Sequence, residues 1–518
     1  MHVRKFLSGR KVFIMKKLMT LALAAGMLLG AATGASAIDF KAKGQWLMGF
    51  SAGDGALVSH TRKAGETSRK ANDTNDIFSA AQRLRLQLDA VASESLSGTV
   101  YFEIGDTTWG QNVSGGALGA DQKIVELKNA YIDWMVPNTD LKFRMGIQGI
   151  QLPNVAGGSA ILDDDVAGIV ASYQFNENVG LTALWARPYN DNWGDKSTRW
   201  AGSDTQYANY HDNMDLFALM LPLTFDGVKV TPWVMYGMRG ENVEVRGEMQ
   251  PYPVVANDTA VGNTHKAYGS MFWAGLPISL TLWDPLNVEL DINYGYVESM
   301  GRYDALRYND LTSRMGSTER EGWLVKALVE YKMDWGTPGI FGWYASGDDG
   351  NVKNGSERMP TISGCGNFMS FMGDGNYGWS SDGSLYDRNM TYAGTWGIGL
   401  RVHDMSFVED LKHSFRVAYW GGTNSPSMAK YVGNSWGWNG SADGAYGTPE
   451  GPYLTTNDGL LEFNLVNSYQ IYENLEANLE LGYIVNMMDD DTWKRSYRDD
   501  SYKKQDAWKA QLIFAYSF

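Results

Sequence analysis

The sequence predicts an all-β protein, an antiparallel transmembrane β-barrel of about 18 strands, with about 16 as the alternative. Three observations support this fold class. Many segments alternate apolar and polar residues with a period of two, as strands do. Long polar connections alternate with short turns, which is typical of barrels with long loops at one end. No segment after residue 37 is a run of about 18 apolar residues, which excludes a helical membrane protein.

The first 37 residues have the pattern of a secretory signal peptide. A basic stretch ends at Lys17, an apolar stretch runs over Leu18–Ala32, and Ala35-Ser36-Ala37 has the small residues of a cleavage site. We therefore expect a signal peptide over 1–37 and a barrel over 38–518. Removing the peptide takes away six positive charges, so the net charge falls from −15 to −21. This charge disfavours nucleic acid as a partner.

The first five predicted strands each have one apolar face and one polar face. They span Asp39–Phe50, Gln82–Ala90, Gly98–Gly105, Ile124–Met135 and Leu141–Gln148. In the fourth strand the alternation shifts near Asn129, as a β-bulge would produce. The polar faces of the first, second and fifth strands carry six basic residues, and we predict that this wall lines the lumen: Lys41, Lys43, Arg83, Arg85, Lys142 and Arg144.

The same alternation continues to the end of the chain. Nine long connections and eight short turns separate 18 strands, and this even number brings both termini to the same end of the barrel. The strands around Leu181, Leu219, Val230 and Phe341 have the weakest patterns, so 16 strands remain the alternative. Aromatic residues make up 13% of the chain, which suits two interfacial girdles. The single cysteine, Cys365, leaves the chain without a disulfide, so the sheet must supply the stability.

The last predicted strand, Asp506–Phe518, is the clearest. Every second residue back from the end is apolar or aromatic, and the residues between them are smaller and more polar. Aromatic residues gather at the end of the apolar face, which favours a strand that faces lipid at a bilayer interface. The three terminal aromatics on this face are Phe514, Tyr516 and Phe518.

With its signal peptide, strand pattern and terminal Phe518, the mature chain resembles the trimeric general porins of Gram-negative outer membranes, and most closely those of sulfate-reducing bacteria. The resemblance implies a homotrimer in outer-membrane lipid and lipopolysaccharide. It also implies a water-filled channel through which small hydrophilic solutes and ions diffuse passively. In that family the barrel-assembly machinery recognises a terminal Phe with an aromatic two residues earlier, here Phe518 and Tyr516.

The resemblance also implies a constriction, because the family folds its third loop into the lumen. Here this loop is Gly149–Asp165, which ends in Asp163, Asp164 and Asp165. We expect these aspartates to lie opposite the basic wall. Other interpretations remain open: the aspartates could be a solvated run or part of a Ca²⁺ site, and the basic residues could be solvated without filtering ions. We expect no metal and no cofactor.

Catalysis finds little support in the sequence. There is no His-x-x-x-His spacing, so we expect the chain not to be an enzyme. Trp-Gly pairs suggest interfacial aromatics beside turn glycines, because too few lumen aromatics are visible for a ladder that would bind sugars. The alternative function is a structural or adhesive outer-membrane barrel that acts through its loops.

Overall fold

The computed structural model describes most of the chain after residue 37. The described residues are 38–55, 57–60, 77–190, 213–240, 243, 266, 268–307, 312–364, 368, 376–382, 392–432, 453–494 and 502–518. The predicted signal peptide over residues 1–37 and Cys365 lie outside the described residues.

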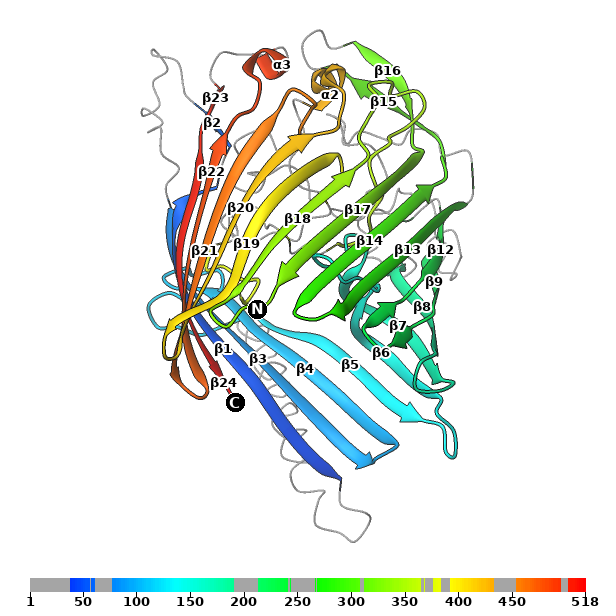
Figure 1. The fold of residues 1–518 in the computed structure, drawn as a ribbon, viewed down its shortest axis with the longest axis vertical. Coiled ribbons are helices and arrows are strands. Elements are labelled where there is room, and N and C mark those ends of the chain that lie inside the picture. Colours follow the sequence, from blue (N-terminus) through cyan, green and yellow to red (C-terminus); the bar gives the residue numbers. More distant parts are fainter. Residues whose placement is uncertain are drawn as a thin grey trace, which may run out of the picture.

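One antiparallel sheet closes on itself to form a barrel (Figure 1). The first strand, β1 (Asp39–Asp54), pairs on one side with β3 (Ile77–Ser93) and on the other with the last strand, β24 (Ala507–Ser517). The other segments follow in chain order: β4 (Leu96–Thr108), β5 (Val125–Met135), β6 (Lys142–Gln151), β7 (Asp163–Gln174), β8 (Gly180–Asn190), β9 (Asn213–Met220), β10 (Leu223–Phe225), β11 (Val228–Val230), β12 (Trp233–Gly240), β13 (Tyr268–Trp283), β14 (Leu286–Val297), β17 (Arg320–Tyr331), β18 (Thr337–Ala345), β19 (Thr395–Val408), β20 (Leu411–Gly422), β21 (Gly459–Tyr472) and β22 (Leu475–Asn486).

The 20 segments of the sheet make 18 strands. The segments β9 and β10 are two halves of one strand, and β11 and β12 are two halves of the next, because β9 pairs with β12 and β10 with β11. Pro222 and Pro232 lie at the two interruptions, and proline has no N–H to donate to the ladder. The prediction of 18 strands is confirmed and the alternative of 16 is wrong.

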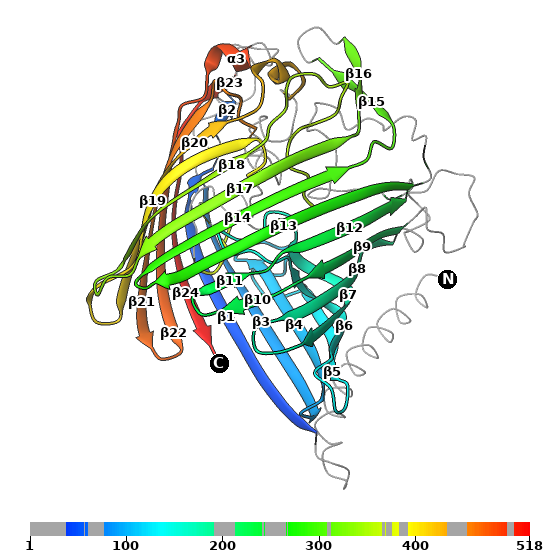
Figure 2. The same cartoon turned by 45° about the vertical axis from the view of Figure 1, so that its right-hand side comes forward.

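The two ends of the barrel differ as predicted. Short turns lie at the lower end in Figure 1, and Asp410 in the β19–β20 turn adopts a left-handed conformation with φ of 62°. Long connections lie at the upper end and carry small elements of their own (Figure 2). These are the hairpin strands β15 (Arg302–Leu306) and β16 (Ser313–Ser317), the paired strands β2 (Val58–His60) and β23 (Tyr502–Lys504), η6 (Pro426–Met428), α2 (Ala429–Val432) and α3 (Asp490–Lys494).

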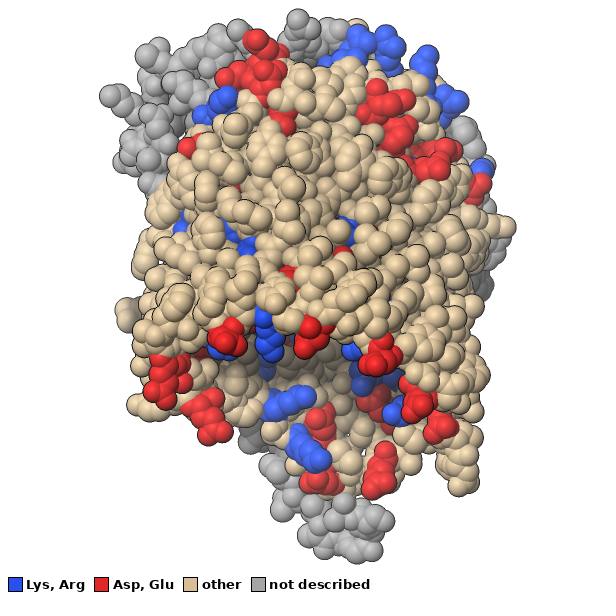
Figure 3. All heavy atoms as spheres, viewed as in Figure 1, with Lys and Arg blue, Asp and Glu red and all other residues tan. Residues whose placement is uncertain are grey.

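Among the described residues, no helix is long and apolar enough to cross a membrane. The strands carry the apolar surface. On the face seen in Figure 3, a broad band of mostly uncharged side chains covers the barrel, and charged side chains gather above and below it. Within this band the strands present exposed apolar side chains such as Ile398, Leu400 and Tyr344. The predicted β-bulge near Asn129 is also confirmed, because the β4–β5 register skips Lys128.

The seam between β1 and β24 shows how the terminal strand is used. Trp508, Tyr516 and Phe518 are exposed on the outer face, while the alternating Gln511 and Ile513 are buried on the inner face. The predicted alternation is therefore confirmed. The last residue still belongs to the ladder: the N–H of Phe518 donates to the carbonyl of Gly44 at 3.0 Å, and the N–H of Gly44 donates back at 2.8 Å.

Gly44 has to be small at this position. A Cβ on Gly44 would lie 2.5 Å from Cζ of Phe518 and 2.8 Å from the carbonyl oxygen of Arg85. The ring of Phe518 thus covers the first strand, and it stacks on Tyr516 with the ring centres 5.7 Å apart.

Deleting Phe518 removes both backbone hydrogen bonds to Gly44 and the ring that covers it, so we expect less heat-modifiable barrel in the membrane fraction. The measurement is the ratio of folded to unfolded bands on unheated and heated gels. Phe518→Tyr is the control, because it retains the ring and the backbone and should assemble normally. Normal assembly of the deleted chain would show that the seam does not depend on its last residue.

Candidate functional site

All six predicted basic residues lie on the lumen face of the barrel. Paired residues of neighbouring strands share a face, and Lys41, Lys43, Arg83 and Arg85 are in phase with the buried Leu47 and out of phase with the exposed Trp46. Lys142 and Arg144 share a face of the sheet with Tyr131 and Asp133 of β5. The exposed Ile132 and Trp134 lie on the other face.

These residues do not form a single ring. Arg85 pairs with Glu103 at 2.7 Å and Arg144 with Asp133 at 2.7 Å. Asp133 lies opposite Ser97 of β4, which is six residues from Glu103 along the strand, or about 20 Å at the rise of a strand. Lys41, Lys43 and Lys142 are exposed toward the short-turn end. The basic wall therefore has an upper and a lower part.

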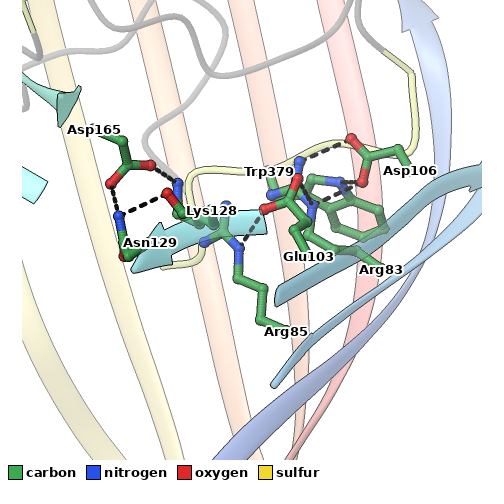
Figure 4. Close-up of polar contacts among 8 residues, drawn as sticks. All are labelled: Arg83, Arg85, Glu103, Asp106, Lys128, Asn129, Asp165 and Trp379. Atoms are coloured by element: carbon green, nitrogen blue, oxygen red, sulfur yellow. Dashed lines mark hydrogen bonds and ion pairs between the residues drawn. The ribbon is translucent and has the colours of Figure 1, made fainter. Parts of the chain in front are cut away.

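The upper part is a cluster of five side chains, which we call the Arg83 cluster: Arg83, Arg85, Glu103, Asp106 and Trp379 (Figure 4). Arg83 forms an ion pair with Asp106, with Nε 2.7 Å from Oδ1. The indole N–H of Trp379 donates to the same oxygen at 2.9 Å, and the guanidinium of Arg83 lies 5.7 Å from the centre of the Trp379 ring. The cluster thus joins the barrel wall to a residue of a distant loop.

Trp379 belongs to the connection between β18 and β19, so this connection also folds into the lumen. Gln511 of β24 donates to the carbonyl oxygen of Trp379 at 2.9 Å. Ser79 of β3 exchanges hydrogen bonds of 2.9 and 3.0 Å with Ser381, and Asn376 donates to Ser468 of β21. The sequence analysis named the third loop as folding inward and made no prediction for this connection.

The three predicted aspartates lie on a strand and not on a loop. The third loop is residues 152–162, because β6 extends to Gln151 and β7 begins at Asp163. Asp164 lies opposite Ile150 in the β6–β7 pairing, whereas Asp163 and Asp165 lie on the other face of the pleat. Asp165 accepts from Lys128 at 2.5 Å and from Asn129 at 2.7 Å, both on β5.

This placement corrects the expected geometry. The three aspartates do not form one acidic patch, and β7 is the direct neighbour of β6, which carries Lys142 and Arg144. They therefore do not lie across the lumen from the basic wall. Asp164 accepts from Ser363 at 2.8 Å and Asp163 from Gln151 at 2.6 Å. A role of these nine charged residues at a constriction stays a prediction.

A buried ion pair anchors the third loop to another part of the wall. Asp291 of β14 accepts hydrogen bonds from the backbone N–H groups of Val155 and Ala156, the latter at 2.7 Å. Lys326 of β17 lies 3.7 Å from Asp291 and donates to the carbonyl of Gly158. Both charged side chains are buried, and separating such a pair leaves an uncompensated charge. The loop is therefore held against β14 and β17.

A polar cavity of about 380 Å³ lies between this loop and the wall. Its lining residues are Gln151, Asn154, Val155, Gly157, Gly158, Glu289, Leu328, Arg401 and Arg416. Arg401 of β19 forms an ion pair with Glu330 at 2.6 Å, and Arg416 of β20 donates to His403 at 3.1 Å. Sequence reasoning missed both arginines, although the alternation of Arg401 with the exposed Leu400 could have revealed the first.

The lumen also contains more aromatic side chains than predicted, and they pack against the loops. The centre of the Trp343 ring lies 4.8 Å from that of Tyr392 and 4.5 Å from that of Trp420. Trp233 donates its indole N–H to the carbonyl of Pro153, and Trp273 donates to that of Pro360. These wall tryptophans hold inward loops and do not form an open ladder for sugars.

No family model and no curated protein matches this chain. Solved structures resemble it in fold. OccK11 (OpdR) of Pseudomonas aeruginosa has 12% identity and a TM-score of 0.47, with 93% of this chain and 96% of that chain covered. OpdL of the same organism has 13% identity and a TM-score of 0.47, with 93% and 99% covered. The outer membrane protein OpdK has 11% identity and a TM-score of 0.46, with 92% and 98% covered. Sequence identities of 11% to 13% with TM-scores of 0.46 and 0.47 do not assign the chain to a family.

No group of three His, Cys, Asp or Glu residues within the described ranges could hold a metal ion. Acidic residues do gather in the turn that starts the β18–β19 connection. Glu357 accepts from the N–H of Asp349 at 2.9 Å and from Asn354 at 3.0 Å. Asp348 accepts from Ser356 and from the hydroxyl of Tyr453. Burial raises the pKa of Glu357 from 4.5 to about 7, opposed by the N–H of Asp349 and reinforced by the charges of Asp348 and Asp349.

This turn should loosen as the pH rises. The pKa of Glu357 is higher in the folded turn than in an open chain, so its stabilisation is fully present below about pH 4.5 and is lost as the pH rises through about 7. Hydrogen exchange of the amides between Asp349 and Glu357, corrected for intrinsic rates, should therefore accelerate over this interval. In Glu357→Gln the acceleration should be absent. Equal acceleration in both proteins would assign the effect to another group.

Proposed function

We propose that this chain is an outer-membrane porin that lets small hydrophilic solutes and ions diffuse passively through its lumen. One observation carries the proposal: charged side chains line the inside of a closed 18-strand barrel whose outside is an apolar band. Barrels of about this size are too wide for their own strands to fill and leave an aqueous interior. Three arginines of the inner wall form ion pairs with acidic residues, namely with Glu103, Asp133 and Glu330. Such charged side chains suit an interior that contains water.

The two inward loops narrow this channel in the proposal. The third loop lies against β14 and β17, and the β18–β19 connection lies against β3 and β24. The solute would pass between them, close to the Arg83 cluster on one side and the Arg401 cavity on the other. Charged patches at close range set the ion preference of pores, so these two sites would determine selectivity.

The cellular setting follows from the sequence. The predicted signal peptide at 1–37 supports export, and the terminal Phe514, Tyr516 and Phe518 would be recognised by the barrel-assembly machinery of a Gram-negative outer membrane. Lipid and lipopolysaccharide would contact the apolar band. A homotrimer is proposed from the family resemblance.

A structural or adhesive barrel is the second candidate, and the packing of the lumen favours it. Phe341, Trp343 and Trp420 of the wall pack with Phe368 and Tyr392 of the β18–β19 connection. Such packing fills part of the interior. A barrel without any conductance would support this candidate.

Purified protein in a planar bilayer tests the proposal. We expect stepwise ohmic conductance, in triplets if the protein is a trimer, and a silent barrel would contradict the porin.

In a salt gradient, replacing Arg83, Arg85 and Arg144 with Gln should shift the reversal potential toward cations, because Asp106, Glu103 and Asp133 lose their partners. Replacing Asp163, Asp164 and Asp165 with Asn should shift it toward anions. If neither triple variant moves the reversal potential, these residues do not line the path of the ion.

A further inference from the structure

A hydrogen bond defines the protonation state of one lumen histidine. Nε of Arg416 donates to Nε2 of His403 at 3.1 Å. An arginine has only donors, so Nε2 of His403 has to offer its lone pair and cannot carry a proton. The imidazole is therefore neutral in this arrangement, with its single proton on Nδ1. A second proton would have to displace Arg416.

His403 lies next to the cavity described above. Arg416 lies directly opposite Arg401 in the β19–β20 pairing, and both line the cavity. The charged groups that act on His403 are Arg401 and Asp404 on its own strand, Glu330 on β17 and Arg416 on β20. Lys412 of β20 pairs with Asp404 at 3.7 Å. Glu289 of β14 lines the same cavity and Glu462 of β21 acts on Arg416, while the residue opposite His403 on β18 is the uncharged Thr337.

We propose that His403 determines the ion preference of the channel through the charge it adds beside the Arg401 cavity, so that the preference for anions increases as the medium becomes more acidic. This inference rests on the proposed porin function and assigns a regulation to that same site.

The consequence follows from charge alone. When Nε2 accepts a proton, the imidazolium stands against the guanidinium of Arg416 and near that of Arg401. The cavity wall gains one positive charge. One unit charge within several ångströms of a permeant ion in a largely aqueous space shifts the energy of that ion by an amount comparable with the thermal energy. We therefore expect the ratio of anion to cation permeability to rise at least about twofold.

The test is the reversal potential in a salt gradient, measured between about pH 7.5 and about pH 5, the range in which histidine changes its charge. The wild-type ratio should rise as the pH falls across this range. In His403→Gln the rise should be at most half as large, because glutamine can accept from Arg416 but does not titrate. His413→Gln is the control: His413 bonds to Asn467 and lies in phase with the exposed Phe415 on the outer face of the same wall, away from the cavity, and this variant should retain the full rise.

The outcomes separate this inference from the proposed function. A barrel that conducts, but whose pH-dependent rise is as large in His403→Gln as in the wild type, overturns the role of His403 and leaves the porin intact. A silent wild-type barrel overturns the porin itself. Should His403→Gln fail to assemble, the wild-type curve still decides: a permeability ratio that does not change between about pH 7.5 and about pH 5 contradicts the inference.

Discussion

Closure of the sheet between β1 and β24 is the constraint on which the rest of the structure depends. Lipid offers no hydrogen-bond partner, so every backbone N–H and C=O of a membrane-spanning strand has to be paired within the protein. Ten residue pairs from Gln45 to Asp54 join the two strands, and the bonds between Phe518 and Gly44 extend this ladder to the last residue. Without this seam the barrel would have two open edges in the bilayer.

A closed barrel of this size has an interior that its own strands leave unfilled, and the chain fills part of it with loops. Buried polar groups hold these loops in place. Asp291 and Lys326 bind backbone groups of the third loop, and Asp106 and Gln511 bind Trp379 of the β18–β19 connection. Elsewhere on the inner wall, charged and polar side chains face water. At these positions, side chains of the same kinds bind a loop. This arrangement leaves polar cavities between loop and wall, as at Arg401 and Arg416.

The strands could be predicted from the sequence because their signal is local. The alternation of apolar and polar residues assigned Trp46, Arg83 and Arg85 to the correct faces of their strands. The shift of this alternation near Asn129 predicted the β-bulge that the structure has. The path of a loop depends on partners far away in the chain. Trp379 contacts Asp106, which is 273 residues away in the sequence, and Lys326 contacts Gly158, which is 168 residues away. A local alternation of apolar and polar residues cannot predict contacts over such separations. The aspartates of β7 were placed on a loop because three adjacent charges have no alternation to read.

The central claim is that a continuous aqueous path remains between the inward loops, and liposome swelling tests this claim most directly. Proteoliposomes should swell in isotonic solutions of small uncharged solutes, and the rate should fall steeply as the solute becomes larger. Swelling at comparable rates with small sugars and large oligosaccharides would contradict the constriction by the loops. No swelling with any solute would contradict the path itself.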